Sequence, residues 1–498
     1  MIDNHNNRFY ESLQDSLTLW YSWLFSDWNS EKRSLIFGRL WIIFLYVVGI
    51  VFWAVLFNWG KTPLDYHDWQ NINMPRLDVM QDAFQYEMLP LHVSCGPCLH
   101  KLTDRLLVLP DVITTPQMFM LLFVSLPTFV FLDLLLHYAV GTLGLLYLQR
   151  KFKLSLMAYS VLFFLFNFNG FIEAHYSVGH STWGGYFLFP WFFVLIFQLI
   201  EGSANWQWVA KLAFLSFYII LSGGEHHFTW MMLFLVALAV SNLRTFKWAL
   251  AGILFSGFLS AIRLLPPVLA IHMYTTDKQF NFQSGYLGIS GLLSALVTIH
   301  PANYVIDGLP DFLGYWEFDY FVGILGAIFI IYFGVIRWLQ DQPERGRFSA
   351  LIFPTAMLFL LSQDGVYKYT LFKLPVLASE SVPTRMVSIP ITLLMIIGAV
   401  YFQDFLHSKD SIIIRWLSGF ALIFLVNDLL THLFVWKINY VAPLMIQRSL
   451  DFSGNSIFVR SDPVYTLTLS IGLALTLLSA LMLAVLVRRE QNQERAAQ

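Results

Sequence analysis

Carboxylate side chains gather in the segment that follows the first long apolar run of the sequence. This segment reads Asp65-Tyr-His-Asp68-Trp, and Asp78 and Asp82 stand further along it. A carboxyl group that is partly desolvated near the hydrocarbon edge has a raised pKa, which suits a general base. We therefore predict that Asp68 or Asp65 is a catalytic base. Asp78 and Asp82 have the i,i+4 spacing that is more typical of solvated helix positions or helix caps.

Two further polar clusters end apolar runs later in the chain. One begins Glu173-Ala-His175, and the other reads Gly223-Gly-Glu225-His226-His227. Since ionisable groups in a membrane protein normally face its interior, we expect both clusters to converge on one cavity. His and Glu are also ligands of zinc or manganese, but the spacing matches no established metal motif, so a hydrogen-bonded polar network is the preferred interpretation. The substrate-binding residues predicted in these clusters are Glu173, His175, His180, Glu225, His226 and His227.

Two arginines stand within or beside apolar runs. Arg263 lies inside the seventh run, where an unpaired guanidinium costs several kcal/mol, so it must have a partner. That partner is a protein carboxylate, the interface reached by snorkelling, or a lipid phosphate held by two hydrogen bonds. Arg385 stands at the outer start of the tenth run and is a second candidate for binding the lipid phosphate.

The composition shows what must position these side chains. Apolar residues make up 57% of the 498 residues and charged residues 12%, whereas a soluble domain has about 25% charged residues. A hydrocarbon core of about 30 Å requires roughly 20 apolar residues per helix, which predicts an all-α polytopic membrane protein. The net charge of −2 indicates no nucleic-acid partner. Twelve candidate spans are centred near Tyr46, Phe131, Phe163, Phe193, Phe217, Phe234, Leu259, Ala327, Ala356, Leu394, Phe424 and Leu475.

Basic residues in alternate loops predict the orientation, because short cytoplasmic loops are rich in Lys and Arg. With both termini cytoplasmic, every second loop is basic, from Arg150 and Lys151 to Arg488 and Arg489. The chain is then a cytoplasmic amphipathic segment at 1–34, a polytopic domain at 35–487 and a cytoplasmic tail at 488–498, with no cleavable signal peptide. The outer loops fall at about 60–116, 272–318, 364–385 and 436–463.

The two cysteines of the chain, Cys95 and Cys98, form a Cys-Gly-Pro-Cys sequence in the first of these outer loops. The sequence matches the redox motif of thioredoxin-like proteins, but no βαβ pattern surrounds it. A local disulfide that closes a short loop on the oxidising side of the membrane is the preferred interpretation, and a catalytic dithiol is the alternative.

Several features of the chain resemble a known group of membrane proteins. The large first outer loop with an Asp just past the first span, about a dozen spans and a membrane-embedded Arg are similar to the GT-C superfamily of polyprenyl-phosphate-dependent glycosyltransferases. The later helices resemble the bacterial YfhO-type membrane proteins. The stretches that carry this resemblance are Gly257-Phe-Leu-Ser-Ala-Ile-Arg-Leu-Leu-Pro266, Tyr286-Leu-Gly288 with Leu292-Leu-Ser-Ala-Leu296, and Val382-Pro-Thr-Arg385-Met.

The resemblance implies a GT-C-like fold in the bacterial inner membrane and an inverting glycosyltransferase. Its partners would be membrane lipids, a polyprenyl-phosphate-linked sugar donor, and a glycan, lipid or protein acceptor on the outer side. The base would be Asp68 or Asp65. The second outer segment reads Glu173-Ala-His175 rather than Asp-x-Asp, so a divalent metal is possible but not favoured. The alternatives are a transporter or flippase for a lipid-linked or anionic solute, and a non-catalytic membrane scaffold.

Overall fold

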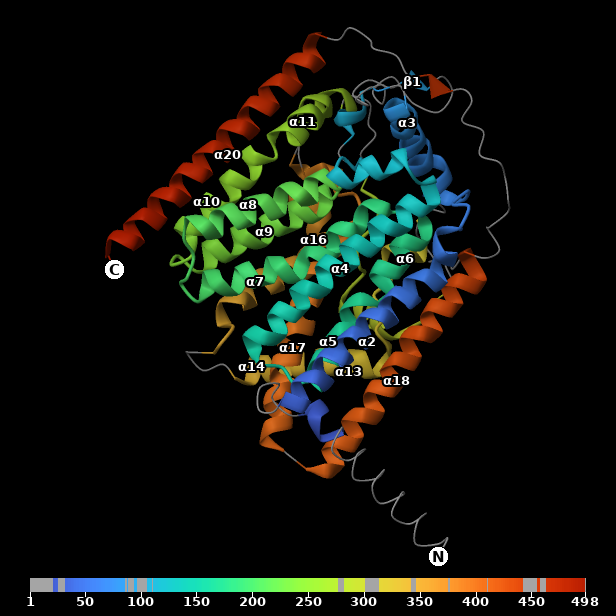
Figure 1. Cartoon of the computed structure of the whole chain (residues 1–498), viewed down its shortest axis with the longest axis vertical. Helices are drawn as coiled ribbons and strands as arrows, with labels where there is room; N and C mark the ends of the chain where they lie inside the picture. Colours follow the sequence, from blue (N-terminus) through green and yellow to red (C-terminus); the bar gives the residue numbers. More distant parts are fainter. Residues whose placement is uncertain are drawn as a thin grey trace, which may run out of the picture.

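The structure is a computed structural model that describes residues 21–25, 32–85, 87, 94–95, 105–109, 111–275, 282–300, 313–341, 346–374, 377–409, 411–441, 455–456 and 463–497. These residues form a helical bundle (Figure 1). A single antiparallel pair of two-residue strands joins β1 (Ser94–Cys95) to β2 (Asn455–Ser456) within the described residues. The all-α class predicted from the sequence is therefore confirmed.

The α-helices follow the apolar runs of the sequence. They are α2 (Lys32–Leu56), α3 (Met74–Gln85), α4 (Leu126–Phe152), α5 (Leu156–Asn167), α6 (Gly170–Val178), α7 (Phe189–Ile200), α8 (Trp206–Leu221), α9 (Glu225–Ser241), α10 (Phe246–Leu259), α11 (Ala261–Thr275), α12 (Ile289–Val297), α13 (Gly323–Phe329), α14 (Arg337–Gln340), α15 (Ile352–Leu361), α16 (Asp364–Tyr369), α17 (Ser388–Ser408), α18 (Ile412–Trp436) and α20 (Pro463–Ala497). The 3-10 and π turns are η1 (Asn58–Gly60), η2 (Trp69–Asn73), η3 (Leu106–Val108), η4 (Pro116–Leu122), η5 (Ser181–Leu188), η6 (Tyr315–Glu317), η7 (Ile330–Ile336), η8 (Ser349–Leu351), η9 (Leu371–Lys373), η10 (Leu377–Ser379), η11 (Pro383–Val387) and η12 (Lys437–Val441).

Every predicted span centre falls in an apolar helix, but the helices differ in length. Eight helical stretches in the described part of the chain are long and apolar enough to cross a membrane. A ninth forms if α10 and α11, which meet at a bend of 75°, make one span. The remaining three predicted centres lie in α8, α9 and the stretch Ser349–Leu361, which have 10–17 residues. An integral multi-pass protein is thus supported, with eight or nine candidate spans in place of the twelve predicted.

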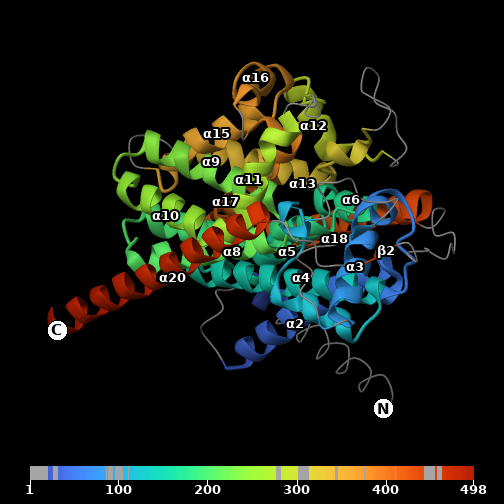
Figure 2. The same cartoon turned by 90° about the horizontal axis from the view of Figure 1, so that it is seen from above.

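The layout of the bundle separates core helices from peripheral helices. An 18-residue segment is completely buried in each of two stretches, Leu156–Val178, which contains α5 and α6, and Pro383–Ser408, which contains α17. By contrast, α18 and α20 lie on opposite sides of the bundle (Figure 1). Figure 2 shows the C-terminal end of α20 extending beyond the other helices. Both peripheral helices expose rows of large apolar side chains, such as Ile413 and Leu417 on α18 and Leu477 and Leu481 on α20. A helix that is apolar all round and unburied is suited to contact with lipid.

Four connections meet at one end of the bundle, which we call the loop end. They are residues 57–73 after α2, 179–181 after α6, 222–224 before α9, and 313–322 before α13. The first connection has an unusual backbone, since Asn58, Trp59, Leu64 and His67 all have positive φ angles. Such a conformation costs a non-glycine residue roughly 1–2 kcal/mol, so tertiary contacts must hold this connection in place.

Candidate functional site

Asp68 lies at the loop end where the first connection approaches the end of α6. Gly179 terminates α6 with a φ angle of +110°, and a Cβ atom there would lie 2.4 Å from the backbone nitrogen of Trp69. Only glycine allows this approach, which brings Asp68 beside His180. The Oδ2 atom of Asp68 accepts a hydrogen bond from Nε2 of His180 at 3.0 Å, and the Asp68 side chain remains 25% exposed. Asp68 is therefore oriented by the protein and still reachable by a substrate.

The ionisation of Asp68 differs from the sequence-based prediction, which expected a raised pKa. Burial does raise the pKa of this carboxyl, but the hydrogen bond and charge of His180 outweigh burial, helped by the charges of His67 and Arg385. The net pKa lies below the ordinary value. Asp68 is consequently a carboxylate at neutral pH, ready to accept a proton without prior deprotonation.

Three polar side chains form a row that starts at Asp68. The Nδ1 atoms of His180 and His175 are 2.7 Å apart, so one donates a hydrogen bond and the other accepts it. Because Nε2 of His180 donates to an ionised carboxylate, a neutral His180 accepts at Nδ1 and His175 donates. The ring of His175 stacks on Trp183 at 4.0 Å with an interplanar angle of 5°. The hydrogen-bonded series from Asp68 through His180 to His175 thus ends at the ring of Trp183.

Trp183 is the centre of the polar cluster. It lies on η5, the turn that begins directly after His180. Its ring lies 4.9 Å from the ring of His227, 6.0 Å from that of His226 and 5.6 Å from that of Trp230. The guanidinium of Arg385 lies 5.3 Å from the ring centroid of Trp183. The histidines of the two clusters predicted to converge therefore lie around one tryptophan, whereas Glu173 of the first cluster does not join them.

Two glutamates that sequence reasoning missed complete the cluster. Arg385 donates through Nε to Oε2 of Glu317 at 2.6 Å and through a second nitrogen to Oε1, a bidentate ion pair. Burial raises the pKa of Glu317, but the Arg385 charge and hydrogen bonds lower it below its ordinary value. His226 pairs with Glu380, which also accepts from Nε1 of Trp230 at 3.2 Å. A buried arginine requires a carboxylate partner, so Arg385 was the signal in the sequence that an acidic residue such as Glu317 lies beside it.

Several buried polar atoms of the cluster have no hydrogen-bond partner among the described residues. They are both ring nitrogens of His227, Nε2 of His175 and Oε2 of Glu225. Buried polar groups are nearly always paired, by protein or by ordered water, because an unmade hydrogen bond costs about 1–3 kcal/mol. The rings of His175 and His227 that carry such atoms both lie against Trp183.

Other predicted site residues lie outside this cluster. Glu173 is completely buried and meets Nδ1 of His432 at 3.1 Å, and Nε2 of His432 meets Asp319 at 2.9 Å. Arg263 is only 2% exposed. It donates to the carbonyl oxygens of three first-loop residues, Leu107 and Leu109 at 2.9 Å and Val112 at 3.2 Å. Asp65, the alternative base, is only 4% exposed.

A metal site was not favoured from the sequence. Among the residues that the structure describes, no group of three or more His, Cys, Asp or Glu side chains is arranged to hold a metal ion. Cys95 lies in β1, opposite Asn455. Cys98 lies outside the described residues, and so the predicted disulfide stays a prediction.

Comparisons with known proteins identify no relative of this chain. No protein-family model, curated protein or solved structure matches the chain. The chemistry must therefore be inferred from the geometry. At the loop end of the bundle, an ionised and partly exposed Asp68 is hydrogen-bonded to His180, and the rings of His180 and His227 and the cation of Arg385 lie near the ring of Trp183.

Proposed function

We propose that this chain is a membrane glycosyltransferase of the GT-C type. It transfers a sugar from a polyprenyl-phosphate-linked donor to an acceptor hydroxyl, with inversion, and Asp68 is the base. The observation that carries the proposal is that an ionised, partly exposed Asp68 is hydrogen-bonded to His180, whose ring lies 5.9 Å from that of Trp183, and that the Arg385 cation lies over the same Trp183 ring. A base, a phosphate-binding cation and a flat apolar ring are the groups that such a reaction requires.

The reaction forms one bond and breaks one. The acceptor oxygen bonds to the anomeric carbon while its proton passes to Asp68, and the bond from that carbon to the phosphate oxygen breaks, releasing polyprenyl phosphate. His180 is hydrogen-bonded to Oδ2 of Asp68. Oδ1 lies 3.4 Å from Nδ1 of His67, and it is the oxygen that we assign to accept the proton of the acceptor hydroxyl. A low pKa makes Asp68 a weak base in the ground state, but the hydroxyl becomes strongly acidic as its bond to carbon forms.

Arg385 is better placed than Arg263 to stabilise the leaving phosphate. Glu317 binds Nε and one terminal nitrogen of Arg385, and no described residue accepts from the other terminal nitrogen. A phosphate oxygen that binds there gains a charge-assisted hydrogen bond in a poorly solvated site. Arg263 instead donates to the first outer loop, and we assign it the role of holding that loop.

The proposed setting is the bacterial inner membrane, with both termini in the cytoplasm and the loop end outside. The support is the distribution of basic residues, since the connections at the opposite end of the bundle are the basic ones. The basic residues at these connections are Arg150, Lys151, Lys153, Arg244, Lys247, Arg337 and Arg347.

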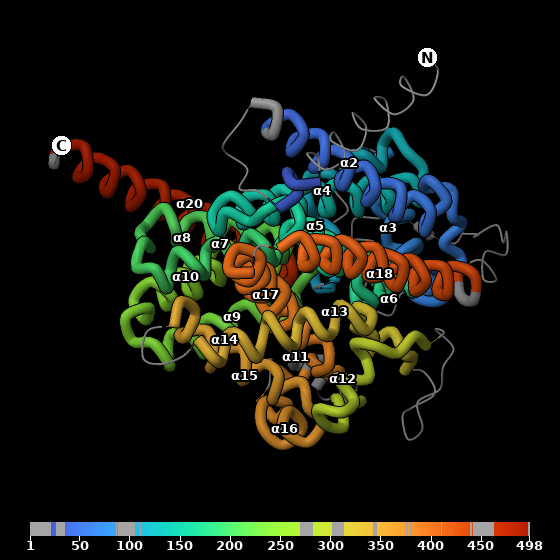
Figure 3. The backbone as a smooth tube through the Cα atoms, turned by 90° about the horizontal axis from the view of Figure 1, so that it is seen from below, coloured from blue at the N-terminus to red at the C-terminus, as the bar shows by residue number. Residues whose placement is uncertain are grey.

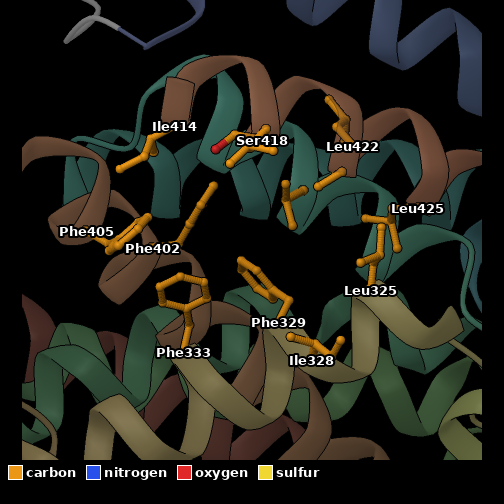
Figure 4. A pocket seen from close by; sticks show the side chains of 13 residues that line it. Leu325, Ile328, Phe329, Phe333, Phe402, Phe405, Ile414, Ser418, Leu422 and Leu425 are labelled. Carbon is orange, nitrogen blue, oxygen red and sulfur yellow. The ribbon is translucent and has the colours of Figure 1, made fainter. Parts of the chain in front are cut away.

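The lining of one cavity supports an enzyme over a transporter. This cavity, of about 260 Å³, lies between α5, α13, η7, α17 and α18. Its labelled lining is apolar apart from the hydroxyl of Ser418, as Figure 4 shows. A transport path for an anionic solute needs polar groups along its whole length, whereas the ionisable cluster stays at the loop end.

The test is direct transfer by the purified protein. In lipid nanodiscs, the protein is incubated with a panel of radiolabelled undecaprenyl-phosphate-linked hexoses and pentoses and with a membrane lipid extract as acceptor. We expect one donor to release undecaprenyl phosphate in proportion to labelled acceptor product. Specific binding of undecaprenyl phosphate, without release from any donor and with movement of label across a sealed vesicle membrane, would instead establish a flippase.

A further inference from the structure

Residues 313–322, which we call the strap, cross the candidate site and link its two halves. The ring of Trp316 meets the ring of His67, the neighbour of Asp68, at 4.7 Å in a T-shaped contact. The next residue, Glu317, binds Arg385. The strap therefore contacts the neighbour of the proposed base on one side and the proposed phosphate-binding cation on the other, so a shift of the strap would disturb both.

The strap is anchored by a buried triad that the reaction itself does not use. Asp319 accepts a hydrogen bond from Nε2 of His432 at 2.9 Å, and Nδ1 of His432 lies 3.1 Å from Glu173. All three side chains are completely buried. The ring of Phe321 stacks on His432 at 4.9 Å, with an interplanar angle of 8°. The triad thus joins three separate segments, the strap, α6 and α18.

The backbone around the triad is fitted to Asp319. Its Oδ1 atom accepts from the backbone nitrogen of Phe321 at 2.9 Å, and the carbonyl of Phe321 accepts from the nitrogen of Gly170 at 2.8 Å. A Cβ atom on Gly170 would lie 1.9 Å from that same Oδ1, so the first residue of α6 must lack a side chain. Two carboxylates bound to one imidazole in a dry site are stable only while the imidazole holds them. Removal of His432 would therefore expel Asp319 and release the strap.

We propose that His432 is a positioning residue, which sets the strap and through it the relative placement of Asp68 and Arg385. The identity of what is positioned rests on the proposed glycosyltransferase function, but the mechanical claim does not. His432 lies on α18, a helix that crosses one face of the bundle beside α17 and α13 (Figure 3). A helix with mostly lipid-facing side chains thereby holds the active geometry through a single buried imidazole.

The first measurement needs no activity. Hydrogen exchange of the strap is compared in the full-length parent, His432→Ala and the matched control Thr431→Ala, whose exposed hydroxyl bonds only within α18. We expect exchange in the strap to be about tenfold faster or more in His432→Ala, with α8 unchanged, because the strap loses its buried anchor. Thr431→Ala should match the parent. Unchanged strap exchange in a folded His432→Ala protein overturns the inference.

The second measurement separates positioning from mere stability. We expect His432→Ala to lower kcat by roughly 10-fold to 100-fold, with a smaller change in KM. His432→Gln keeps an amide donor near the position of Nε2, so it should restore most of the lost transfer rate. If the strap loosens but kcat stays at the parent value, the strap does not position the site and the inference fails.

One further variant and the parent protein keep the test decisive. If His432→Ala does not fold, Asp319→Asn provides the same comparison, because a neutral amide weakens the charged pair without changing its size. A parent protein that transfers no sugar from the whole donor panel would reject the proposed function, and the exchange data would still decide whether the triad anchors the strap.

Discussion

Replacing Asp68 by Asn is the sharpest perturbation of the proposed mechanism. The amide has the size of the carboxylate, and its oxygen still accepts the hydrogen bond from Nε2 of His180. It cannot accept the proton of the acceptor hydroxyl. The proposed donor-binding side of the site, built on Arg385 and Glu317, makes no hydrogen bond to the substituted atoms, so we expect donor affinity to change much less than the transfer rate.

The expected magnitude follows from the contacts that change. Loss of a general base lowers a transfer rate by about 10²-fold or more, which corresponds to roughly 2.7 kcal/mol or more in the activation free energy. Loss of charge on Asp68 also turns a charge-assisted hydrogen bond into a neutral one. Because the side chain is 25% exposed, we expect the free energy of unfolding to fall by only about 1 kcal/mol.

The assay is single-turnover transfer with a saturating labelled donor, together with the affinity for undecaprenyl phosphate. Asp82→Asn on α3 is the matched control, since it makes the same chemical change outside the cluster. Asp65→Asn tests the alternative base. If Asp68→Asn and Asp65→Asn both turn over at the parent rate while remaining folded by size-exclusion chromatography, the base is not in the first outer loop and the reasoning is refuted.

Four other outcomes are expected. Arg385→Lys keeps a charge but not the bidentate pair with Glu317, so undecaprenyl phosphate should bind about tenfold more weakly in equilibrium titrations; unchanged affinity would place the phosphate elsewhere. Arg263→Ala removes three hydrogen bonds to loop carbonyls and should lower the free energy of unfolding by about 3 kcal/mol or more, measured by denaturant titration, whereas a loss of donor affinity at unchanged stability would restore it as the phosphate ligand. Burial lowers the pKa of His67, so the unfolded chain binds a proton first as the pH falls through about 6.5, and stability should decline from there down to the lowered pKa; a His67→Gln protein with the same decline would contradict this assignment. Cys95, after mild reduction, should react with a membrane-impermeant thiol reagent on intact cells, and protection until permeabilisation would invert the proposed topology.

The positions of the apolar helices could be predicted, because the distribution of apolar residues along the chain determines them. All twelve apolar centres lie in helices, because hydrophobic runs of that length have few alternatives in a membrane. The span count was less predictable, since α8 ends just before Gly223 and Gly224 and α9 begins just after them, and a run of apolar residues does not reveal where such a turn shortens a helix.

The candidate site was predictable in its residues more than in its pairings. The convergence of His175 and His226 was expected from polar clusters at the same membrane side, and the rings of both lie near that of Trp183. Glu173 was grouped with them because its helix face could not be read from one sequence. The pKa of Asp68 was predicted with the wrong sign because its neighbour His180 is 112 residues away in the chain.

The burial of His432 at the end of a lipid-facing helix has a consequence for biogenesis. Before α18 docks, its imidazole must sit in lipid without partners, and a polar group there is costly. Docking becomes favourable only when α6 and the strap already offer Glu173 and Asp319. The amine of Lys437, one residue beyond the helix, then donates to the carbonyl of Val55 on α2. We therefore expect α18 to dock after α6 and the strap are in place.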